Sequence, residues 1–345
     1  MSNRYMVKIA AITLLALLLV FGYFIFASGG REEGEVHPES EQTEENGTAG
    51  EKEKIVIGVT LPSDATDYQE ELGEYIKKLG ISDGECELNL QYAQWDVEKQ
   101  QEQMRNFIED EVDAIILCPV NAKSFLNVLR DAKNAGIPVI NLNMKVDTVS
   151  SEYIATYVGA SSSEQAALAA EMVIEYFGGK EGKVGIIEGA PGSDPAIYRT
   201  QTFLEEVNTY PNIEVVGIIC GQWQRNTAGL AAMDLLNRDG EIDLIYCHDS
   251  NMAMGAYEML EKMGKEDEVK VIGVGNSEEY MEAVKDGKLY GIVTQPTDYE
   301  AEYAWITAKK AAKGNRLRPW YKNPVEVVTE ENVEGYRSPM EVVGG

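Results

Sequence analysis

The sequence predicts an α/β fold made of two doubly wound lobes, each with a parallel sheet that carries helices on both faces. Short apolar runs alternate with longer amphipathic segments from Ile55 onward, which is the pattern of parallel strands alternating with helices. The pattern occurs twice, over units of similar size, without a close sequence repeat. The length of 345 residues, 44% of them hydrophobic, is also more than one small domain needs.

The first unit contains five apolar runs that we interpret as strands. Between them, the segments 97–109 and 123–134 place their apolar residues on one helical face, and the second segment is followed by Gly136, a natural helix cap. The expected strands cover residues 55–60, 87–93, 114–119, 138–143 and 156–161.

The second unit repeats this rhythm and is followed by a last helix and an extended segment. Its expected strands cover residues 183–189, 214–220, 243–247, 269–275 and 291–295. Its expected helices cover residues 163–177, 198–208, 226–238, 251–263 and 277–286. The last helix is expected over 299–313 and the extended segment over 324–329.

Residues 1–30 are interpreted as a membrane anchor or a signal segment. Arg4 and Lys8 precede an apolar run over Ile9–Ala27, which is long enough to cross a ~30 Å hydrocarbon core as a helix. A cleaved signal peptide usually has a shorter apolar core, and no Cys follows to accept a lipid, so we favour an uncleaved anchor over a removed signal. In both cases the rest of the chain is exported.

The segment 31–54 is expected to be an acidic flexible tether, because it has nine acidic and three basic residues and hardly an apolar one. The whole chain has 30 Lys and Arg against 58 Asp and Glu, a net charge of −28. Such a surface repels a phosphate backbone, which excludes nucleic acid as a main partner. We interpret the acidity of the folded body as a solubility feature rather than as recognition of a cation.

The chain offers little material for a metal site, a cofactor site or a catalytic centre. It contains 2 His and 4 Cys without paired metal-ligand spacing. It has no phosphate-binding glycine loop and no nucleophile elbow, and a catalytic triad would have to use His248. The cysteines are interpreted as buried thiols, because Cys220 and Cys247 would flank the central strand about 9–10 Å apart, too far for a disulfide. We expect no enzyme, no metal and no cofactor.

Polar and aromatic side chains gather in the loops that leave the expected strands. In open α/β sheets a ligand lies beyond the carboxyl ends of the strands. Amide and guanidinium groups pair with adjacent hydroxyls, and an aromatic face covers the C–H side of a sugar ring, so these loops favour a neutral polyhydroxylated ligand. The candidate binding residues are Asp67, Tyr68, Asn143, Arg199, Trp223, His248, Asn276 and Gln295.

Several of these residues also allow a purely structural interpretation. Arg199 would then be solvated or ion-paired, Trp223 a core aromatic, and His248 a hydrogen-bonded structural histidine at the end of an apolar strand. As a binding residue, Arg199 is expected to face the open cleft of the ligand-free protein, so that its removal weakens binding and hardly changes folding. Three other indoles are interpreted as packing residues: Trp95, Trp305 and Trp320.

Six stretches over about residues 54–340, in their order and spacing, carry a resemblance to a known family. They are VDAIILCPVNAKS, NAGIPVINLN, YRTQTFLE, CHDSNMAMGAYEML, VKVIGVGNSEEYMEAVKDGKLYGIVTQP and VEVVTEENVEGY. In these stretches the chain resembles the extracytoplasmic sugar-binding proteins of the ribose- and galactose-binding type, which have the type I periplasmic-binding-protein fold and serve ABC importers and sensors.

The resemblance implies roles for four of the candidate residues. Arg199 takes the arginine position that holds ring or hydroxyl oxygens, Trp223 takes an aromatic wall position, and Gln295 takes a polar position at the end of the last strand. His248 stands where the family has an asparagine that touches the ligand.

The chain also departs from the family at two positions. Asn143-Met144 stands where pentose and hexose binders often have Asp-Arg, and Gly275-Asn276 stands where they often have an Asp. These departures argue against a simple ribose or galactose ligand. They favour a modified sugar, a polyol or a larger glycoside.

The resemblance further implies three hinge crossings and closure of the lobes on the ligand. One lobe is expected to contain residues 55–160 and 298–321, and the other residues 162–295 and 323–340. The expected partners are a small-molecule carbohydrate and an ABC permease. The alternative is a membrane-tethered sensor that presents its ligand-bound form to a histidine kinase or chemoreceptor. We expect a monomer that works outside the cytoplasm.

Overall fold

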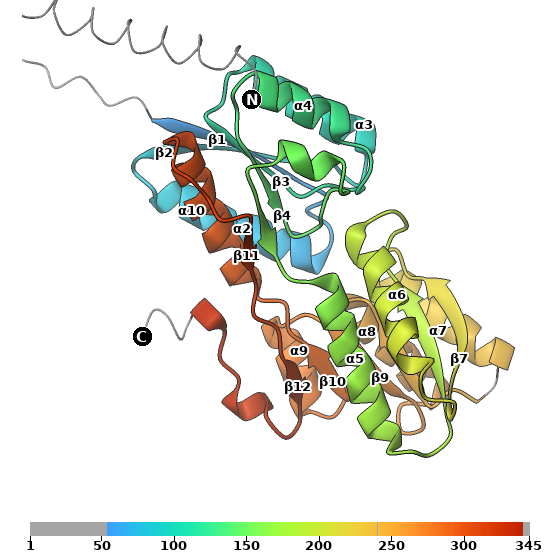
Figure 1. Ribbon diagram of the computed structural model, residues 1–345. Helices are drawn as coiled ribbons and strands as arrows, with labels where there is room; N and C mark the ends of the chain where they lie inside the picture. The colour runs from blue at the N-terminus through green and yellow to red at the C-terminus, as the bar shows by residue number, and fades with distance from the viewer. Residues whose placement is uncertain (1–53, 240, 341–345) are drawn as a thin grey trace, which may run out of the picture. The chain divides into compact units, whose positions relative to one another are not determined.

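The computed structural model describes residues 54–239 and 241–340, which fold around two six-stranded sheets (Figure 1). The first sheet has the strand order β11-β5-β4-β3-β1-β2, and all of its pairings are parallel. Its strands are β1 (Ile55–Leu61), β2 (Cys86–Tyr92), β3 (Ala114–Leu117), β4 (Val139–Leu142), β5 (Thr156–Gly159) and β11 (Trp320–Lys322).

The second sheet has the equivalent strand order, β12-β10-β9-β8-β6-β7. Its pairings are parallel except that of β12 with β10, which is antiparallel. Its strands are β6 (Gly182–Glu188), β7 (Ile213–Cys220), β8 (Leu244–Cys247), β9 (Lys270–Val274), β10 (Gly291–Val293) and β12 (Val327–Thr329).

Helices cover both faces of the first sheet, and we call this assembly the first lobe. On one face α2 and α10 pack through Leu72 and Trp305, and on the other α3 and α4 pack through Phe107 and Leu129. A short 3-10 turn, η1, precedes β5. The bounds are α2 (Asp67–Ser82), α3 (Val97–Glu109), α4 (Leu126–Asn134), η1 (Ser150–Tyr153) and α10 (Thr297–Ala312).

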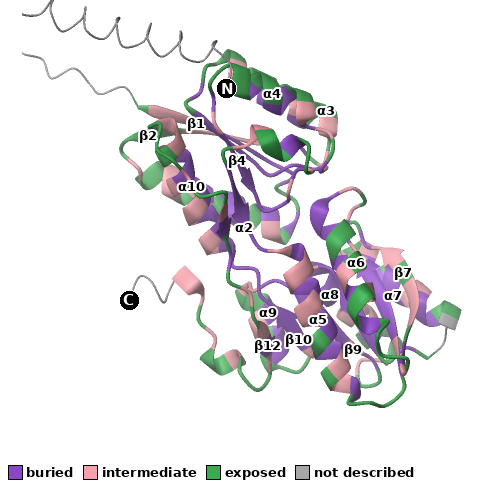
Figure 2. Cartoon of the chain, viewed as in Figure 1, coloured by how far each residue is buried: buried purple, intermediate pink, exposed green. Residues whose placement is uncertain are grey.

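The second sheet is covered in the same way, which makes the second lobe. Ala170 of α5 and Phe203 of α6 pack on one face, whereas α7, α8 and α9 pack on the other through Leu235, Leu260 and Val284. The strands in the middle of both lobes are buried and the outer helix faces are exposed (Figure 2). The bounds are α5 (Ser162–Phe177), α6 (Asp194–Val207), α7 (Arg225–Asp239), α8 (Ser250–Met263), α9 (Glu278–Lys285) and the 3-10 turn η2 (Val333–Gly335).

This architecture confirms the predicted fold class of two doubly wound lobes. The chain passes between the two sheets three times: from β5 to α5, from β10 to α10, and from β11 to β12. The expected strands and helices are present within a few residues of their predicted ends. Helix α6 begins at Asp194, four residues before the expected 198. No range was predicted from the sequence for α2, β11, η1 or η2.

The cysteines agree with the thiol interpretation. Cys220 ends β7 and Cys247 ends β8, and these strands lie on opposite sides of β6, so the two cysteines flank a strand as expected. All four cysteines are free. Cys86, Cys118 and Cys247 are buried as expected, whereas Cys220 is only partly buried.

The predicted anchor Ile9–Ala27 lies outside the residues that the structure describes, as does nearly all of the predicted tether. Between residues 54 and 340, position 240 aside, no helix has both the length and the apolar character needed to cross a bilayer.

Helices α7 and α8 cross with their backbones almost in contact, and this crossing gives a test of the packing. A Cβ atom on Gly255 would lie 1.9 Å from the carbonyl oxygen of Arg225. Because backbone cannot move aside as a flexible side chain can, Gly255→Ala should lower the free energy of unfolding by about 3 kcal/mol. Urea unfolding measures this loss.

The matched control is Gly84→Ala, because no atom lies within 4 Å of a Cβ at Gly84. Its effect should stay within about 0.5 kcal/mol. Equal unfolding midpoints for the two variants would contradict the close crossing.

Candidate functional site

A cavity of about 50 Å³ lies where the carboxyl ends of the parallel strands of both lobes meet. Every loop that lines it follows one of these strands, as the topological rule for open α/β sheets predicts. The first lobe contributes Thr66, Asp67, Tyr68, Gln69, Trp95, Asn143 and Met144. The second contributes Pro195, Arg199, Trp223, Asp249, Ser250, Asn251, Val274, Gly275, Tyr280 and Gln295.

Six of the eight predicted binding residues line this cavity, and two do not. The six are Asp67, Tyr68, Asn143, Arg199, Trp223 and Gln295. Asn276 lies outside the lining, and its side-chain amide donates to the Tyr336 hydroxyl at 3.5 Å.

His248 is a fully buried histidine behind the cavity wall. Its Nδ1 accepts a hydrogen bond from the backbone N–H of Gly189 at 3.3 Å, and its Nε2 lies 3.3 Å from the Thr200 hydroxyl. Burial, together with the charge of Arg199, lowers the pKa of His248 well below its usual value, so the ring is neutral. In this structure it therefore fits the structural alternative rather than the asparagine-like contact that the resemblance implies.

Arg199 is fixed by its own lobe rather than open to solvent. Only 3% of the residue is exposed, and its guanidinium donates to Gln165 Oε1 at 2.6 Å, to Gln295 Oε1 at 2.7 Å and to the His248 carbonyl. Burial lowers the pKa of Arg199, but a guanidinium stays charged in proteins. The expectation that Arg199 faces an open cleft is therefore wrong, because the residue and its partners are buried. Its hydrogen bonds also predict a contribution to folding, in place of the small one that was expected.

Six cavity-lining residues carry a buried polar atom that has no hydrogen-bond partner within the described part of the chain. A buried polar atom without a partner costs about 1–3 kcal/mol, so such atoms are normally paired. Their concentration at one cavity marks a surface suited to a polar ligand. The atoms are Thr66 Oγ1, Gln69 Oε1, Arg199 Nε, Trp223 Nε1, Ser250 Oγ and Asn251 Oδ1.

Hydrogen bonds to neighbouring protein groups fix the orientation of two amides in this set. Gln69 donates its Nε2 to Asn143 Oδ1 at 3.3 Å, which leaves the Gln69 oxygen unpartnered. Asn251 donates its Nδ2 to the Trp223 carbonyl at 3.3 Å, and its oxygen is likewise unpartnered. Each amide therefore offers an acceptor, because its donor is already engaged.

Two indoles reach the cavity from equivalent loops of the two lobes. Gln94-Trp95 follows β2 with φ of 58° and 59°, and Gln222-Trp223 follows β7 with φ of 59° and 61°. A left-handed backbone is costly for residues other than glycine, so its repetition points to a functional constraint. Trp95 was interpreted as a packing residue, and this is only half of its role, because it also lines the cavity. The Gln-Trp pair after the second strand of each unit is the signal that could have found it.

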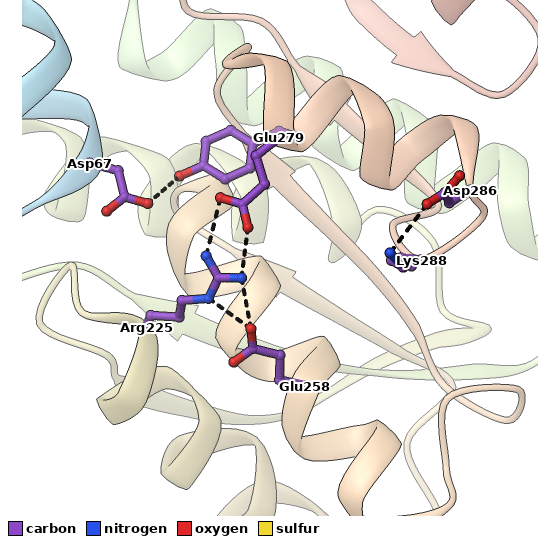
Figure 3. A network of polar contacts seen from close by, with 7 residues as sticks. Asp67, Arg225, Glu258, Glu279, Asp286 and Lys288 are labelled. Atoms are coloured by element: carbon purple, nitrogen blue, oxygen red, sulfur yellow. Dashed lines mark hydrogen bonds and ion pairs between the residues drawn. The ribbon is translucent and has the colours of Figure 1, made fainter.

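Acidic side chains at and near the cavity make one contact between the lobes and one cluster within the second lobe. Asp67 accepts a hydrogen bond from the Tyr280 hydroxyl at 3.1 Å, across the lobes. Arg225 bridges Glu258 at 2.7 Å and Glu279 at 2.8 Å, which ties the start of α7 to α8 and α9 beside this contact (Figure 3).

Asp249 caps α8 by accepting from the Met252 N–H at 2.7 Å. Burial raises the pKa of Asp249 to about 6. This carboxyl group was not among the predicted binding residues, although it lines the cavity beside Ser250.

Similarity to known proteins extends over both lobes. The sequence profile of a family described as the periplasmic binding protein domain matches residues 57–316. A xylitol-binding protein of Mycolicibacterium smegmatis is 28% identical over 83% of this chain and 80% of that protein. A putative rhizopine-binding protein of Rhizobium meliloti is 28% identical over 76% of this chain and 85% of that protein.

A similar solved structure is that of an ABC transporter solute-binding protein from Bacillus halodurans with bound myo-inositol. It matches with a TM-score of 0.79 and 30% identity, and the match covers 83% of this chain and 98% of that one.

The bonding of Arg199 predicts that Arg199→Ala destabilises the protein without any ligand. The substitution leaves the His248 carbonyl and Gln165 Oε1 without a donor, and it leaves Gln295 Oε1 with only the 3.5 Å bond from Gln165 Nε2, so the free energy of unfolding should fall by about 3 kcal/mol. Urea unfolding of the ligand-free protein measures this. The control is Arg238→Ala, which breaks only an exposed pair with Asp234 and should cost less than about 0.5 kcal/mol. An Arg199→Ala variant as stable as this control would show that the hydrogen bonds contribute nothing.

Proposed function

The chain belongs to the periplasmic binding protein family, whose members bind solutes and are not enzymes, and we propose that it captures a neutral sugar-like polyol in the cavity. We further propose that it delivers this ligand to an ABC importer outside the cytoplasm. The apolar segment Ile9–Ala27 would hold the protein at the membrane. The alternative of a tethered sensor would present the same ligand-bound form to a kinase or chemoreceptor, and no feature of residues 54–340 that the structure describes favours it.

The balance of the six unpartnered atoms is the observation that carries the proposal. Arg199 Nε and Trp223 Nε1 can only donate, whereas Gln69 Oε1 and Asn251 Oδ1 can only accept. The hydroxyls of Thr66 and Ser250 can do either.

A ligand for this wall must therefore both donate and accept. A hydroxyl group has one donor and two acceptor sites, so a ligand with several hydroxyls satisfies both kinds of wall atom. A carboxylate would leave the amide oxygens of Gln69 and Asn251 unpaired. An ammonium group would leave the N–H groups of Arg199 and Trp223 unpaired.

The aromatic surface of the site supports the same class of ligand. The indoles of Trp95 and Trp223 offer apolar faces to the C–H side of a ring. The bound myo-inositol of the Bacillus halodurans protein and the xylitol of the mycobacterial relative support a polyol as the ligand of this chain.

We also propose that binding closes the lobes about the three crossings. The moving parts would be residues 55–160 with 298–321 and residues 162–295 with 323–340. Direct contacts between these parts support closure: the Ala122 N–H donates to the Gly192 carbonyl at 3.1 Å, and Tyr280 donates to Asp67. Ligand held by both lobes would add hydrogen bonds that neither lobe can make alone.

A ligand screen tests the proposed function. Polyols such as myo-inositol and xylitol, neutral sugars, sugar acids and amino sugars are compared by thermal unfolding. A true ligand at 100 times its dissociation constant should stabilise the protein by about 2.7 kcal/mol. Stabilisation by sugar acids or amino sugars alone would contradict the donor and acceptor balance, and no stabilisation by any polyol or sugar would overturn the proposal.

The two indoles give a second test. Trp95→Ala and Trp223→Ala should each weaken binding of the polyol found in that screen by at least about tenfold, because each removes an aromatic face from the cavity. Titration calorimetry measures affinity, and urea unfolding of the ligand-free variants separates a loss of folding from a loss of binding. Tyr210→Ala, at an exposed site of the second lobe, is the control and should bind normally. Normal binding by Trp95→Ala would return Trp95 to a packing role.

A further inference from the structure

Glu300 is a carboxylate with no exposed surface, one turn into α10 and at the centre of the three crossings. Its Oε2 accepts from the Tyr68 hydroxyl at 2.7 Å and from Asn143 Nδ2 at 2.9 Å. Its Oε1 accepts from Asn323 Nδ2 at 2.8 Å, and the backbone N–H of Ala160 adds a fourth donor. All four of these partners are donors, which is the environment of an ionised carboxylate.

These partners belong to every crossing between the lobes. Ala160 lies in the first crossing, between β5 and α5, and Glu300 itself follows the second. Asn323 lies in the third and is tied to the other two, because its N–H donates to the Gly159 carbonyl at 3.2 Å and its Nδ2 lies 3.4 Å from the Pro296 carbonyl. Glu300 is therefore linked by hydrogen bonds to all three crossings between the lobes.

The remaining partners of Glu300 lead into the cavity. A carboxylate cannot donate, so Asn143 must present its Nδ2 to Glu300 and its Oδ1 to the other side. That oxygen can only accept, so Gln69 must present its Nε2 to Asn143. The Gln69 oxygen is thereby left as an unpartnered acceptor at the cavity wall.

We propose that Glu300 is a positioning residue whose negative charge, relayed through the Asn143 amide, fixes the Gln69 amide as a ligand acceptor and couples it to the hinge. This inference rests on the proposed function, because it assigns an origin to one of the contacts of that site. It predicts that ligand binding depends on the charge of Glu300 although Glu300 does not line the cavity.

The charge of Glu300 responds to pH near neutrality. Burial raises its pKa to about 7, against the opposing effect of its hydrogen-bond donors and of Arg199. The titratable or charged groups that face it are Tyr68 from α2, Cys118 after β3, Tyr157 from β5 and Arg199 from α6. Burial raises the pKa of Tyr68 and Tyr157 well above the usual value and that of Cys118 to about 12, so these three stay neutral around pH 7.

Protonation of Glu300 should increase the free energy of unfolding and decrease the affinity for ligand. The pKa is higher in the folded protein than in the unfolded chain, so the contribution of Glu300 to stability is present at low pH and declines as pH rises through about 7. Binding should instead improve as pH rises, because only the ionised group holds both amides in the required orientation. A residue with a merely structural role would not produce this opposition.

Glu300→Gln tests this positioning role. The glutamine amide has the size of the carboxyl group, but its NH₂ group is a donor and would face the groups that now donate to Glu300. Binding of myo-inositol is measured by titration calorimetry at pH 6 and pH 8. If the neutral form binds tenfold more weakly, wild-type affinity should fall about fivefold from pH 8 to pH 6. Glu300→Gln should bind about tenfold more weakly than wild type at pH 8 and show little further loss at pH 6.

Glu302→Gln is the matched control, because Glu302 lies on the same helix, is only partly buried and does not line the cavity. It should keep the wild-type affinity and the wild-type pH profile. Wild-type binding by Glu300→Gln at both pH values would overturn the inference.

A measurement without ligand keeps the inference testable if Glu300→Gln does not fold or if no polyol binds. The side-chain amide signals of Asn143 and Gln69 are followed by NMR in the ligand-free wild-type protein from pH 5.5 to pH 8.5. Both should shift with one midpoint near 7, whereas the signals of Gln201, which bonds Glu205 on the surface of α6, should not. Failure of the polyol screen with this shared midpoint would contradict the proposed function alone. Absence of the midpoint would contradict the relay.

Discussion

The requirement that buried polar groups be paired shapes the region where the parallel strands of both lobes end. Those ends bring loop amides, hydroxyls and charges into one enclosed place, where an unpaired group costs about 1–3 kcal/mol. Behind the cavity wall the groups satisfy one another, as His248 does with Gly189 and Arg199. Of the twelve unpartnered buried side-chain atoms in the described residues, six belong to residues that line the cavity. The fold thus concentrates its unsatisfied hydrogen-bonding capacity where a ligand can use it.

Two buried charges organise this arrangement, and both are held by neutral partners. Arg199 requires Gln165 and Gln295 to turn their oxygens toward it, and Glu300 requires Asn143 to turn its amide nitrogen. Neither charge has an ion-pair partner within 4.0 Å among the described residues. An ion pair would constrain only its two members, whereas a charge solvated by amides fixes the direction of each amide, and these amides in turn define the wall. The cost of burying the charges is offset by several short hydrogen bonds.

The sequence predicted the two lobes and six of the seventeen residues that line the cavity, because both follow from hydrophobic periodicity and from the carboxyl-end rule. Element ends were less accurate where local chemistry decides them. The Pro195 at the first turn of α6 was a start signal that periodicity alone overlooked. The three-residue strand β11 is too short to show a period. The orientation of His248 away from the cavity depends on its contacts with Thr200 and Gly189, which no local pattern encodes.

Gln69 and Glu300 show why the rest of the site was not predictable. Each lies on an amphipathic helix, and a polar residue there reads as part of the solvated face. Glu300 is separated from Tyr68 by 232 residues and from Asn143 by 157 along the chain, so the pairing exists only once the hinge has assembled. Trp95 is a different case, because the repeated Gln-Trp pair was visible in the sequence and needed only a comparison of the two units.

The third crossing explains why the two sheets have the same strand order although only the second contains an antiparallel strand, β12. Because the carboxyl edges of both sheets meet at the cavity, a chain that runs straight across must enter the second sheet against the direction of its neighbours. After each of the first two crossings a helix, α5 or α10, runs back along the lobe. The strand that follows can therefore run parallel to its neighbours. Between β11 and β12 there are only four residues and no helix, so β12 pairs antiparallel with β10. The first residue of this short connection, Asn323, is the one that donates to Glu300.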